Sequence, residues 1–347
     1  MRHGRSVSAA VVGVFACAGA AQGTSLVVEN LTAASVPRHN AGVATHDGKL
    51  YLWGGISGSV RTDRAEVYDA VADAWSDLAD CPVSRSGMGN FALNGKIYSL
   101  GGEGTSSGSF NNDVRRYHPD NDAWETMNAF PVNVMDPLEA VVDGRAYVMG
   151  GRQGYGQTYS DVREYDETSD SWVARAPMPV STFLGGIATY DDKVYVFGGN
   201  HKTSESSNEF LRTVQVYDPA LNTWAQIDNL PVAPLHATAF TGNNGIFVLL
   251  QQQIFDNGVA EPYPYALHYA PDNGQWTTYD FNCPSDVYLV TEATRIGSYA
   301  YLIGDTTDHA SAYRMAVPEP AVLLLLGTGA VALTGVLRRR RMKGGRR

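Results

Sequence analysis

The stretch KLYLWGG, residues 49–55, decides the fold. Its first five residues are mostly apolar and follow a short Asp-Gly turn, which is typical of the second strand of a hairpin. The paired glycines Gly54 and Gly55 allow positive φ angles and the close approach of another backbone. Further along the chain, Tyr68 stands seven residues before Trp75.

The same pattern recurs along the chain, which is the mark of a repeat protein. Three more runs end in paired glycines: KIYSLGG at Gly101 and Gly102, RAYVMGG at Gly150 and Gly151, and KVYVFGG at Gly198 and Gly199. A Tyr precedes a Trp by seven residues in five units: Tyr68 and Trp75, Tyr117 and Trp124, Tyr165 and Trp172, Tyr217 and Trp224, Tyr269 and Trp276. The tryptophans are 49, 48, 52 and 52 residues apart. Each unit therefore predicts four strands: an inner strand, the strand ending in Gly-Gly, the Tyr strand and the Trp strand.

This unit resembles the kelch repeat of β-propellers, and the resemblance covers nearly all of residues 25–315. It implies an all-β, six-bladed kelch-type propeller over residues 24–316, whose stacked blades bury Tyr and Trp between neighbours. In the fifth unit Gln251-Gln252 replaces the glycine pair, and the sixth unit has no Trp strand. We expect the spare N-terminal strand Ser25–Leu31 to complete the sixth blade and close the ring. The alternative is five blades with an irregular end.

Residues 1–23 resemble a signal peptide. A basic start precedes a weakly apolar run, and Ala18-Gly19-Ala20 supplies the small residues that a signal peptidase needs, so we expect cleavage near residues 20–23. The run is short for a membrane span. A lipoprotein signal with Cys17 as the lipidated residue is the alternative.

Residues 317–347 contain three parts in order. The motif Pro318, Glu319 and Pro320 is followed by an uncharged apolar run, Ala321–Leu337, and then by the basic cluster Arg338, Arg339, Arg340 and Arg341. This order resembles the PEP-CTERM sorting signal of Gram-negative bacteria. The resemblance implies a transmembrane helix over 321–337 that anchors the chain in the inner membrane transiently, and processing by an exosortase-type membrane protease. A plain C-terminal anchor is the alternative, and both interpretations place the body outside the cytoplasm.

The charge is unevenly distributed. The whole chain has a net charge of −10, but the first 23 residues hold two Arg and no acid, and residues 321–347 hold six Arg, one Lys and no acid. The segment between them carries 17 basic and 36 acidic residues, a net charge of −19. Nucleic acid is therefore excluded as a partner, because phosphate contacts need clustered Lys and Arg.

Cys81 and Cys283 occupy equivalent links after the fourth strands of the first and fifth units. Equivalent positions in separated blades lie farther apart than a disulfide allows. We expect two free or buried thiols.

Two regions are candidates for binding. The first is the set of loops between the second and third strands, where the spacing varies and aromatic residues stand among Gly, Ser, Asn and Thr: Ile56–Glu66, Glu103–Asp113, Arg152–Asp161, Asn200–Thr213 and Gln253–Tyr265. Exposed aromatic rings beside amides and hydroxyls suit sugars. The alternative is that these loops are soluble turns whose aromatics cover the blades.

The second region is one mouth of the central channel. Sixteen residues before the first glycine or its equivalent, the inner strands begin with Arg38, Arg85, Val134, Thr182, Leu235 and Tyr288; His39 and His236 stand one residue later. Two Arg on adjacent blades could hold a carboxylate or sulfate of an exopolysaccharide. The alternative is that both Arg donate hydrogen bonds to carbonyls between blades. The candidate ligand-binding residues are Arg38, Arg85, His39, His236 and Tyr288.

The sequence favours a binding or scaffold protein over an enzyme. It contains no H-E-x-x-H and no G-x-S-x-G in a strand-to-helix setting, and we expect no metal and no cofactor. Asp136, Glu139 and His236 could carry acid–base chemistry only if the fold brings them together. We therefore predict an exported surface or matrix protein that contacts glycans or other proteins through one propeller face. The alternative is a sugar-modifying enzyme similar to the kelch-type sialic-acid mutarotases or epimerases.

Overall fold

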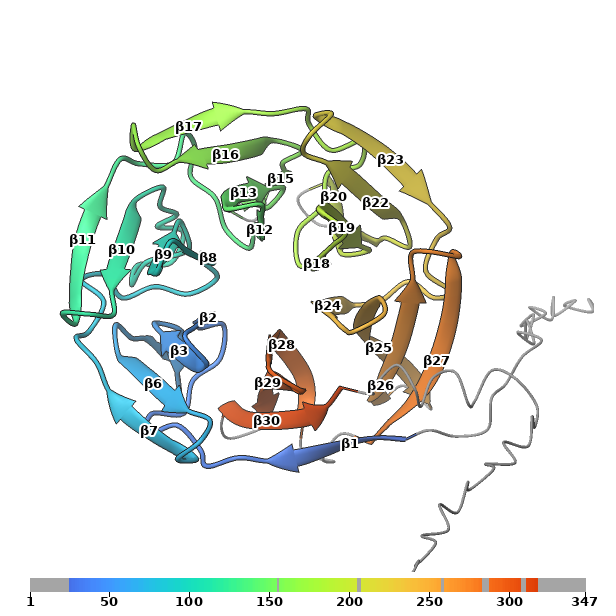
Figure 1. Ribbon diagram of the computed structural model, residues 1–347, viewed down its shortest axis with the longest axis horizontal. Coiled ribbons are helices and arrows are strands. Elements are labelled where there is room, and N and C mark those ends of the chain that lie inside the picture. Colours follow the sequence, from blue (N-terminus) through green and yellow to red (C-terminus); the bar gives the residue numbers. More distant parts are fainter. Residues whose placement is uncertain are drawn as a thin grey trace, which may run out of the picture.

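The computed structural model describes residues 25–154, 156–204, 207–256, 259–282, 287–306 and 310–317. The expected signal peptide, the tail beyond residue 317 and Cys283 lie outside these residues. The described part consists of strands and turns and forms a six-bladed all-β propeller (Figure 1). No helix in it has the length and apolarity that a membrane crossing requires.

Blades 1 to 4 are separate four-stranded antiparallel sheets. Their strands, from the axis outward, are β2 (Gly42–His46), β3 (Lys49–Trp53), β6 (Ala65–Asp69) and β7 (Ala74–Asp77) in blade 1; β8 (Gly89–Leu93), β9 (Lys96–Leu100), β10 (Val114–His118) and β11 (Ala123–Met127) in blade 2; β12 (Leu138–Val142), β13 (Arg145–Met149), β16 (Val162–Asp166) and β17 (Ser171–Ala174) in blade 3; β18 (Gly186–Tyr190), β19 (Lys193–Phe197), β22 (Val214–Asp218) and β23 (Thr223–Ile227) in blade 4. This is the predicted order of inner, Gly-Gly, Tyr and Trp strands.

Blades 5 and 6 depart from this regularity. Blade 5 holds β24 (His236–Thr241), β25 (Ile246–Asp256), β26 (Val259–Ala270) and β27 (Gln275–Asn282), and blade 6 holds β28 (Val287–Ile296), β29 (Tyr299–Thr306) and β30 (Ala310–Ala316). The N-terminal strand β1 (Ser25–Asn30) pairs antiparallel with β30 through Val28–Asn30 and parallel with β27 through Ser25–Val27. The two blades thereby share one eight-stranded sheet.

The second strand of each regular blade follows a two-residue turn. Three of these turns are Asp-Gly or Asn-Gly, and both of their residues have positive φ: Asp47 at 48° and Gly48 at 69° in blade 1 are representative. Such turns match the twist of a hairpin. The prediction of a hairpin before each Gly-Gly strand is confirmed.

The paired glycines hold neighbouring blades together. Gly102 N–H donates to the carbonyl of Val134, four residues before the next inner strand, over 2.8 Å. Gly55 and Gly151 make the same bond to Arg85 and Thr182. A Cβ on Gly101 would lie 2.3 Å from the Val134 oxygen, so only glycine admits this approach.

The Tyr and Trp positions form a second connection between blades. In blade 2, the Tyr117 hydroxyl donates to Asp122 over 2.7 Å, Asp122 also accepts the backbone N–H of Ala79, and Trp124 Nε1 donates to the Ala79 carbonyl. Ala79 belongs to the link that leaves blade 1. Blades 1 and 4 repeat the set with Asp73 and Asn222. The constant seven-residue interval therefore reflects one hydrogen-bonded unit that joins successive blades.

Cys81 lies in the apolar layer between blades 1 and 2, beside Trp53 and Met88, and it is 1% exposed. It forms no disulfide, and burial raises the pKa of its thiol. The prediction of a free buried thiol is confirmed for Cys81.

Candidate functional site

The six innermost strands surround a central channel with a volume of about 470 Å³. Side chains alternate along each strand, so that Asn90 and Ala92 of β8 face the channel while Gly89, Phe91 and Leu93 are buried between blades. The volume lies within the range of small-molecule sites.

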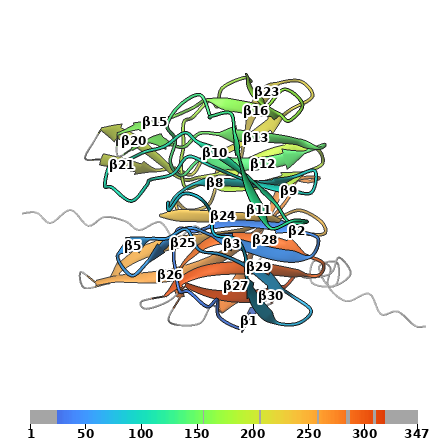
Figure 2. The same ribbon diagram turned by 90° about the vertical axis from the view of Figure 1, so that its left-hand side faces the viewer.

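The two ends of the channel differ. At one end, three hairpins project between the second and third strands: β4 (Ile56–Ser57) with β5 (Val60–Arg61), β14 (Arg152–Gln153) with β15 (Gln157–Thr158), and β20 (Asn200–Ser204) with β21 (Ser207–Phe210). We call this end the hairpin face; Figure 2 shows β5, β15, β20 and β21 together on one side. The other end carries the turns that join the first to the second strand and the third to the fourth, and we call it the turn face. The varied loops predicted from sequence thus lie on one face.

A ring of left-handed residues surrounds the channel at the hairpin face. Asn40, Gly87, Asp136 and Leu184 occupy equivalent positions in blades 1 to 4 and have φ angles of 51°, 63°, 49° and 54°. Gly87 N–H donates to the Asn40 carbonyl over 3.2 Å, and Asp136 N–H donates to the Gly87 carbonyl over 2.9 Å. A leucine in this conformation is strained, and such strain is found mainly at functional sites.

Two Arg–carboxylate pairs lie at this ring, and Asp136 of the ring belongs to one of them. Arg61 on β5 donates to Ser86 Oγ over 3.0 Å and pairs with Glu103 of the next blade. Arg152 on β14 donates to Asp136 from both Nε, over 2.8 Å, and Nη2, over 2.7 Å. The two guanidinium groups keep 19% and 14% of their side-chain surface exposed, whereas Glu103 and Asp136 keep 2% and 4%. At the hairpin face, Arg61 and Arg152 are therefore partly exposed hydrogen-bond donors that are held in place by the buried carboxylates of Glu103 and Asp136.

Arg152 also contacts blade 4. Its guanidinium carbon lies 4.9 Å from the ring centre of Phe183, which is a cation–π contact. Burial raises the pKa of Asp136, and the positive charge of Arg152 opposes this shift. The pair fixes the Arg152 plane at the mouth of the channel.

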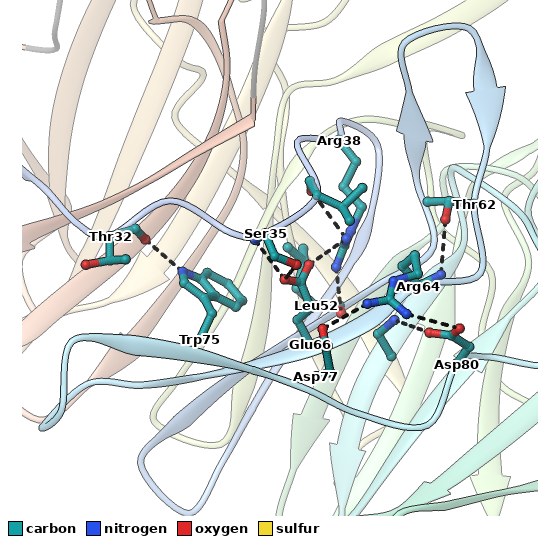
Figure 3. A network of polar contacts seen from close by, with 12 residues as sticks. Thr32, Ser35, Arg38, Leu52, Thr62, Arg64, Glu66, Trp75, Asp77 and Asp80 are labelled. Carbon is teal, nitrogen blue, oxygen red and sulfur yellow. Dashed lines mark hydrogen bonds and ion pairs between the residues drawn. The ribbon is translucent and has the colours of Figure 1, made fainter.

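The predicted Arg pair lies beneath this surface. Arg38 is 1% exposed; its Nη1 pairs with Glu66 at 2.7 Å and its Nη2 donates to the Leu52 carbonyl over 3.2 Å (Figure 3). Arg85 is fully buried and pairs with Asp113 at 2.7 Å. Arg85 also donates to the carbonyls of Gly101 and Ser99. These contacts favour the alternative in which both Arg bond to carbonyls of the blades.

The other three predicted residues are placed differently. His39 is half-buried beside the hairpin β4–β5, where its backbone exchanges two hydrogen bonds with Ile56. His236 lines the channel, its Nδ1 has no partner among the described residues, and burial lowers the pKa of its imidazole to about 4. Tyr288 lies on β28, and its side chain is outside the described part.

The sixteen-residue spacing, applied to the fifth unit, misplaces the inner strand of that unit by two residues. Gly42 pairs with Trp53 in blade 1, and the corresponding partner of Leu250 in blade 5 is Ala237. The β24–β25 hairpin has a four-residue loop, Gly242–Gly245, where blade 1 has a two-residue turn. Ala237 of β24 therefore takes the place of Gly42.

Arg61, Glu103 and Arg152 were missed as site residues, although all three stand in the loops singled out by their variable length. Asp136, Glu139 and His236, which no sequence feature connected, all line the channel. No group of three His, Cys, Asp or Glu side chains suited to a metal ion occurs among the described residues.

The fold just described is that of kelch-like β-propellers. Residues 50–251 match the Attractin/LZTR1 β-propeller, and the chain belongs to this family. Residues 316–341 match the PEP-CTERM protein-sorting motif, which confirms that prediction and indicates an exported protein.

Curated relatives match over single stretches. Kelch-like protein 40 of Xenopus laevis is 28% identical over 91 residues, which is 24% of this chain and 15% of that protein. The F-box protein AFR of Arabidopsis thaliana is 32% identical over 115 residues, which is 33% of this chain and 28% of that protein. Each match therefore spans less than a third of the relative's own length.

A solved structure described as "Structure of YjhT" superposes with a TM-score of 0.68 at 17% identity. The superposition covers 84% of this chain and 97% of that one. At this identity the likeness concerns the fold alone.

Proposed function

We propose that the chain is an exported binding protein, routed by an exosortase-type membrane protease through its C-terminal motif, and that it contacts glycans of an exopolysaccharide or surface proteins through the hairpin face. The observation that carries this proposal is the convergence of the projecting hairpins and the Arg61–Glu103 and Arg152–Asp136 pairs around the channel mouth. The partly exposed side chains of Arg61 and Arg152 suit the hydroxyl and carboxylate groups of sugars. His39 and His236 lie within reach of the same mouth and belong to the proposed surface.

We expect Arg61→Ala to weaken glycan binding by about tenfold or more, because a hydrogen bond from a charged donor contributes roughly 1.5–3 kcal/mol. The measurement is a titration on a glycan array that includes neutral, uronic and sulfated chains. Arg145→Ala is the matched control, because Arg145 stands at the start of β13 on the turn face with 55% of its side chain exposed. Equal affinities for wild type and Arg61→Ala at unchanged melting temperature would contradict the proposal.

A sugar-modifying enzyme is the second candidate, and it is favoured by Asp136, Glu139 and His236 lining one channel. Burial lowers the pKa of His236 to about 4, so its imidazole is neutral at pH 7 and is a weak proton acceptor. Turnover of sugar anomers by the purified protein, lost in His236→Gln, would establish this candidate in place of the first.

We also propose that β1 closes the ring. Its pairing with β30 and the 2.7 Å ion pair between Arg314 and Glu29 support this role. Removal of residues 25–30 would leave the edges of β27 and β30 unpaired, and open edges promote association. Light scattering should then show concentration-dependent oligomers in the truncated protein. A truncated protein that stays monomeric and melts at the wild-type temperature would contradict closure by β1.

A further inference from the structure

The described chain ends on the turn face. Ala316, the last residue of β30, pairs with Tyr299, which directly follows the β28–β29 turn. Val317 N–H then donates to the carbonyl of Ser298, within that turn, over 2.9 Å, and Val317 is 3% exposed. The backbone is thus hydrogen-bonded to the propeller up to Val317, the residue before the Pro-Glu-Pro motif.

Very little chain separates this point from the apolar run. Only Pro318, Glu319 and Pro320 lie between Val317 and Ala321. The four residue steps from Val317 to Ala321 span at most about 14 Å even when fully extended. This is of the same order as the depth of the headgroup layer of one leaflet, which is roughly 5–8 Å. A run embedded in the bilayer would therefore bring the turn face to the lipid headgroups.

The turn face carries groups that suit a headgroup layer. The strands that follow its turns begin with a basic residue in blades 1 to 4: Lys49, Lys96, Arg145 and Lys193. Two of the most exposed large apolar side chains also lie on this face, in turns between third and fourth strands: Val71, 98% exposed, in blade 1 and Leu221, 71% exposed, in blade 4.

Several acidic residues of the turns between third and fourth strands accept hydrogen bonds within the propeller. Asp69 accepts the backbone N–H groups of Val71 and Ala72, and Asp73 accepts the Tyr68 hydroxyl and the Thr32 N–H. Asp122 and Asp170 serve blades 2 and 3 in the way that Asp73 serves blade 1. These carboxylates act as acceptors for the protein, whereas Asp47, Asp143, Asp191 and Asp192 stand in the turns beside the basic residues.

We propose that the turn face of the propeller docks on the lipid surface while the tail is anchored, so that the hairpin face points away from the membrane. This rests on the proposed sorting of the chain through its C-terminal motif. The hairpin face is then free to bind before any cleavage of the tail. Binding and release from the membrane are separate events in this arrangement.

The test compares two exposed valines of blade 1 on opposite faces, Val60 on β5 and Val71 in the β6–β7 turn. The full chain, with Cys17 and Cys283 replaced by serine and with Cys81 buried, carries Val60→Cys or Val71→Cys labelled with a donor fluorophore. It is reconstituted into phosphatidylethanolamine–phosphatidylglycerol vesicles with a headgroup-labelled acceptor lipid. We expect energy transfer at least twofold higher from position 71 than from position 60. Equal transfer, higher transfer from position 60 or no transfer from either position overturns the proposal.

A linker variant tests the short connection. Twenty Gly and Ser residues inserted between Val317 and Pro318 have a root-mean-square length of about 25 Å and should remove most of the difference between the two positions. A difference that persists unchanged contradicts the role given to the short connection. Glycan binding on the same vesicles separates the two proposals, because its loss with energy transfer intact overturns only the function of the hairpin face.

Discussion

Glu66→Ala is expected to lower the free energy of unfolding by about 3–5 kcal/mol, because it leaves the buried Arg38 guanidinium without its counter-ion. Glu66 is fully buried, pairs with Arg38 at 2.7 Å and accepts the backbone N–H of Ser35 over 2.8 Å. It also accepts the Ser35 hydroxyl. The measurement is equilibrium denaturation of the purified propeller.

Asp77→Ala is the matched control for Glu66→Ala. Asp77 pairs with Arg64 at 2.9 Å, but 67% of the Asp77 side chain is exposed. Exposed pairs contribute about 0–1 kcal/mol, so the control should change stability little. A loss below about 1 kcal/mol for Glu66→Ala as well would mean that Arg38 is not held as a structural ion pair and is available to a ligand at the mouth.

Gly101→Ala is expected to lower the free energy of unfolding by about 2–5 kcal/mol. Gly101 has φ 66°, a conformation that costs other L-residues about 1–2 kcal/mol. The added Cβ would also lie 2.3 Å from the Val134 carbonyl oxygen, which already accepts the Gly102 N–H. Relief of this clash needs a backbone shift between blades 2 and 3, and such overpacking costs roughly 1–3 kcal/mol more.

Gly144→Ala separates the two causes in that prediction. Gly144 has φ 68°, but no atom lies within 4 Å of its added Cβ. Gly144→Ala should therefore lower the free energy of unfolding only by the conformational cost, about 1–2 kcal/mol. Equal losses in Gly101→Ala and Gly144→Ala, measured by chemical denaturation, would contradict the role of the glycine pairs in bringing blades together.

The parts of the fold that follow from local chemistry were predictable from the sequence. The glycine pairs are needed wherever one blade's backbone meets the next. The Tyr–Trp interval is constant because Tyr117, Asp122, Trp124 and their equivalents form one hydrogen-bonded unit with the link from the preceding blade. Repetition of these signals predicted the first five blades, and the sixth was predicted from an incomplete unit completed by the N-terminal strand.

The site was less predictable, because its geometry depends on contacts between blades. Arg38 and Arg61 are both arginines of blade 1. Only the packing shows that Arg38 is buried in an ion pair with Glu66, whereas Arg61 pairs with Glu103 on the hairpin face. The position of His236 along the inner strand was predicted wrongly for a similar reason. A longer hairpin loop in blade 5 shifts the inner strand by two residues, and spacing along the chain does not distinguish a longer loop from a longer strand.

Hydrogen–deuterium exchange of the exported propeller with and without a polysaccharide identified on the glycan array tests the hairpin face most directly. The account predicts slower exchange in the three hairpins β4–β5, β14–β15 and β20–β21 and in the ring at Asn40, Gly87, Asp136 and Leu184. The turns at Asp47 and Asp143 on the turn face should exchange at unchanged rates. Protection confined to the turn face or to the outer strands β7, β11, β17 and β23 would contradict the hairpin face as the binding surface.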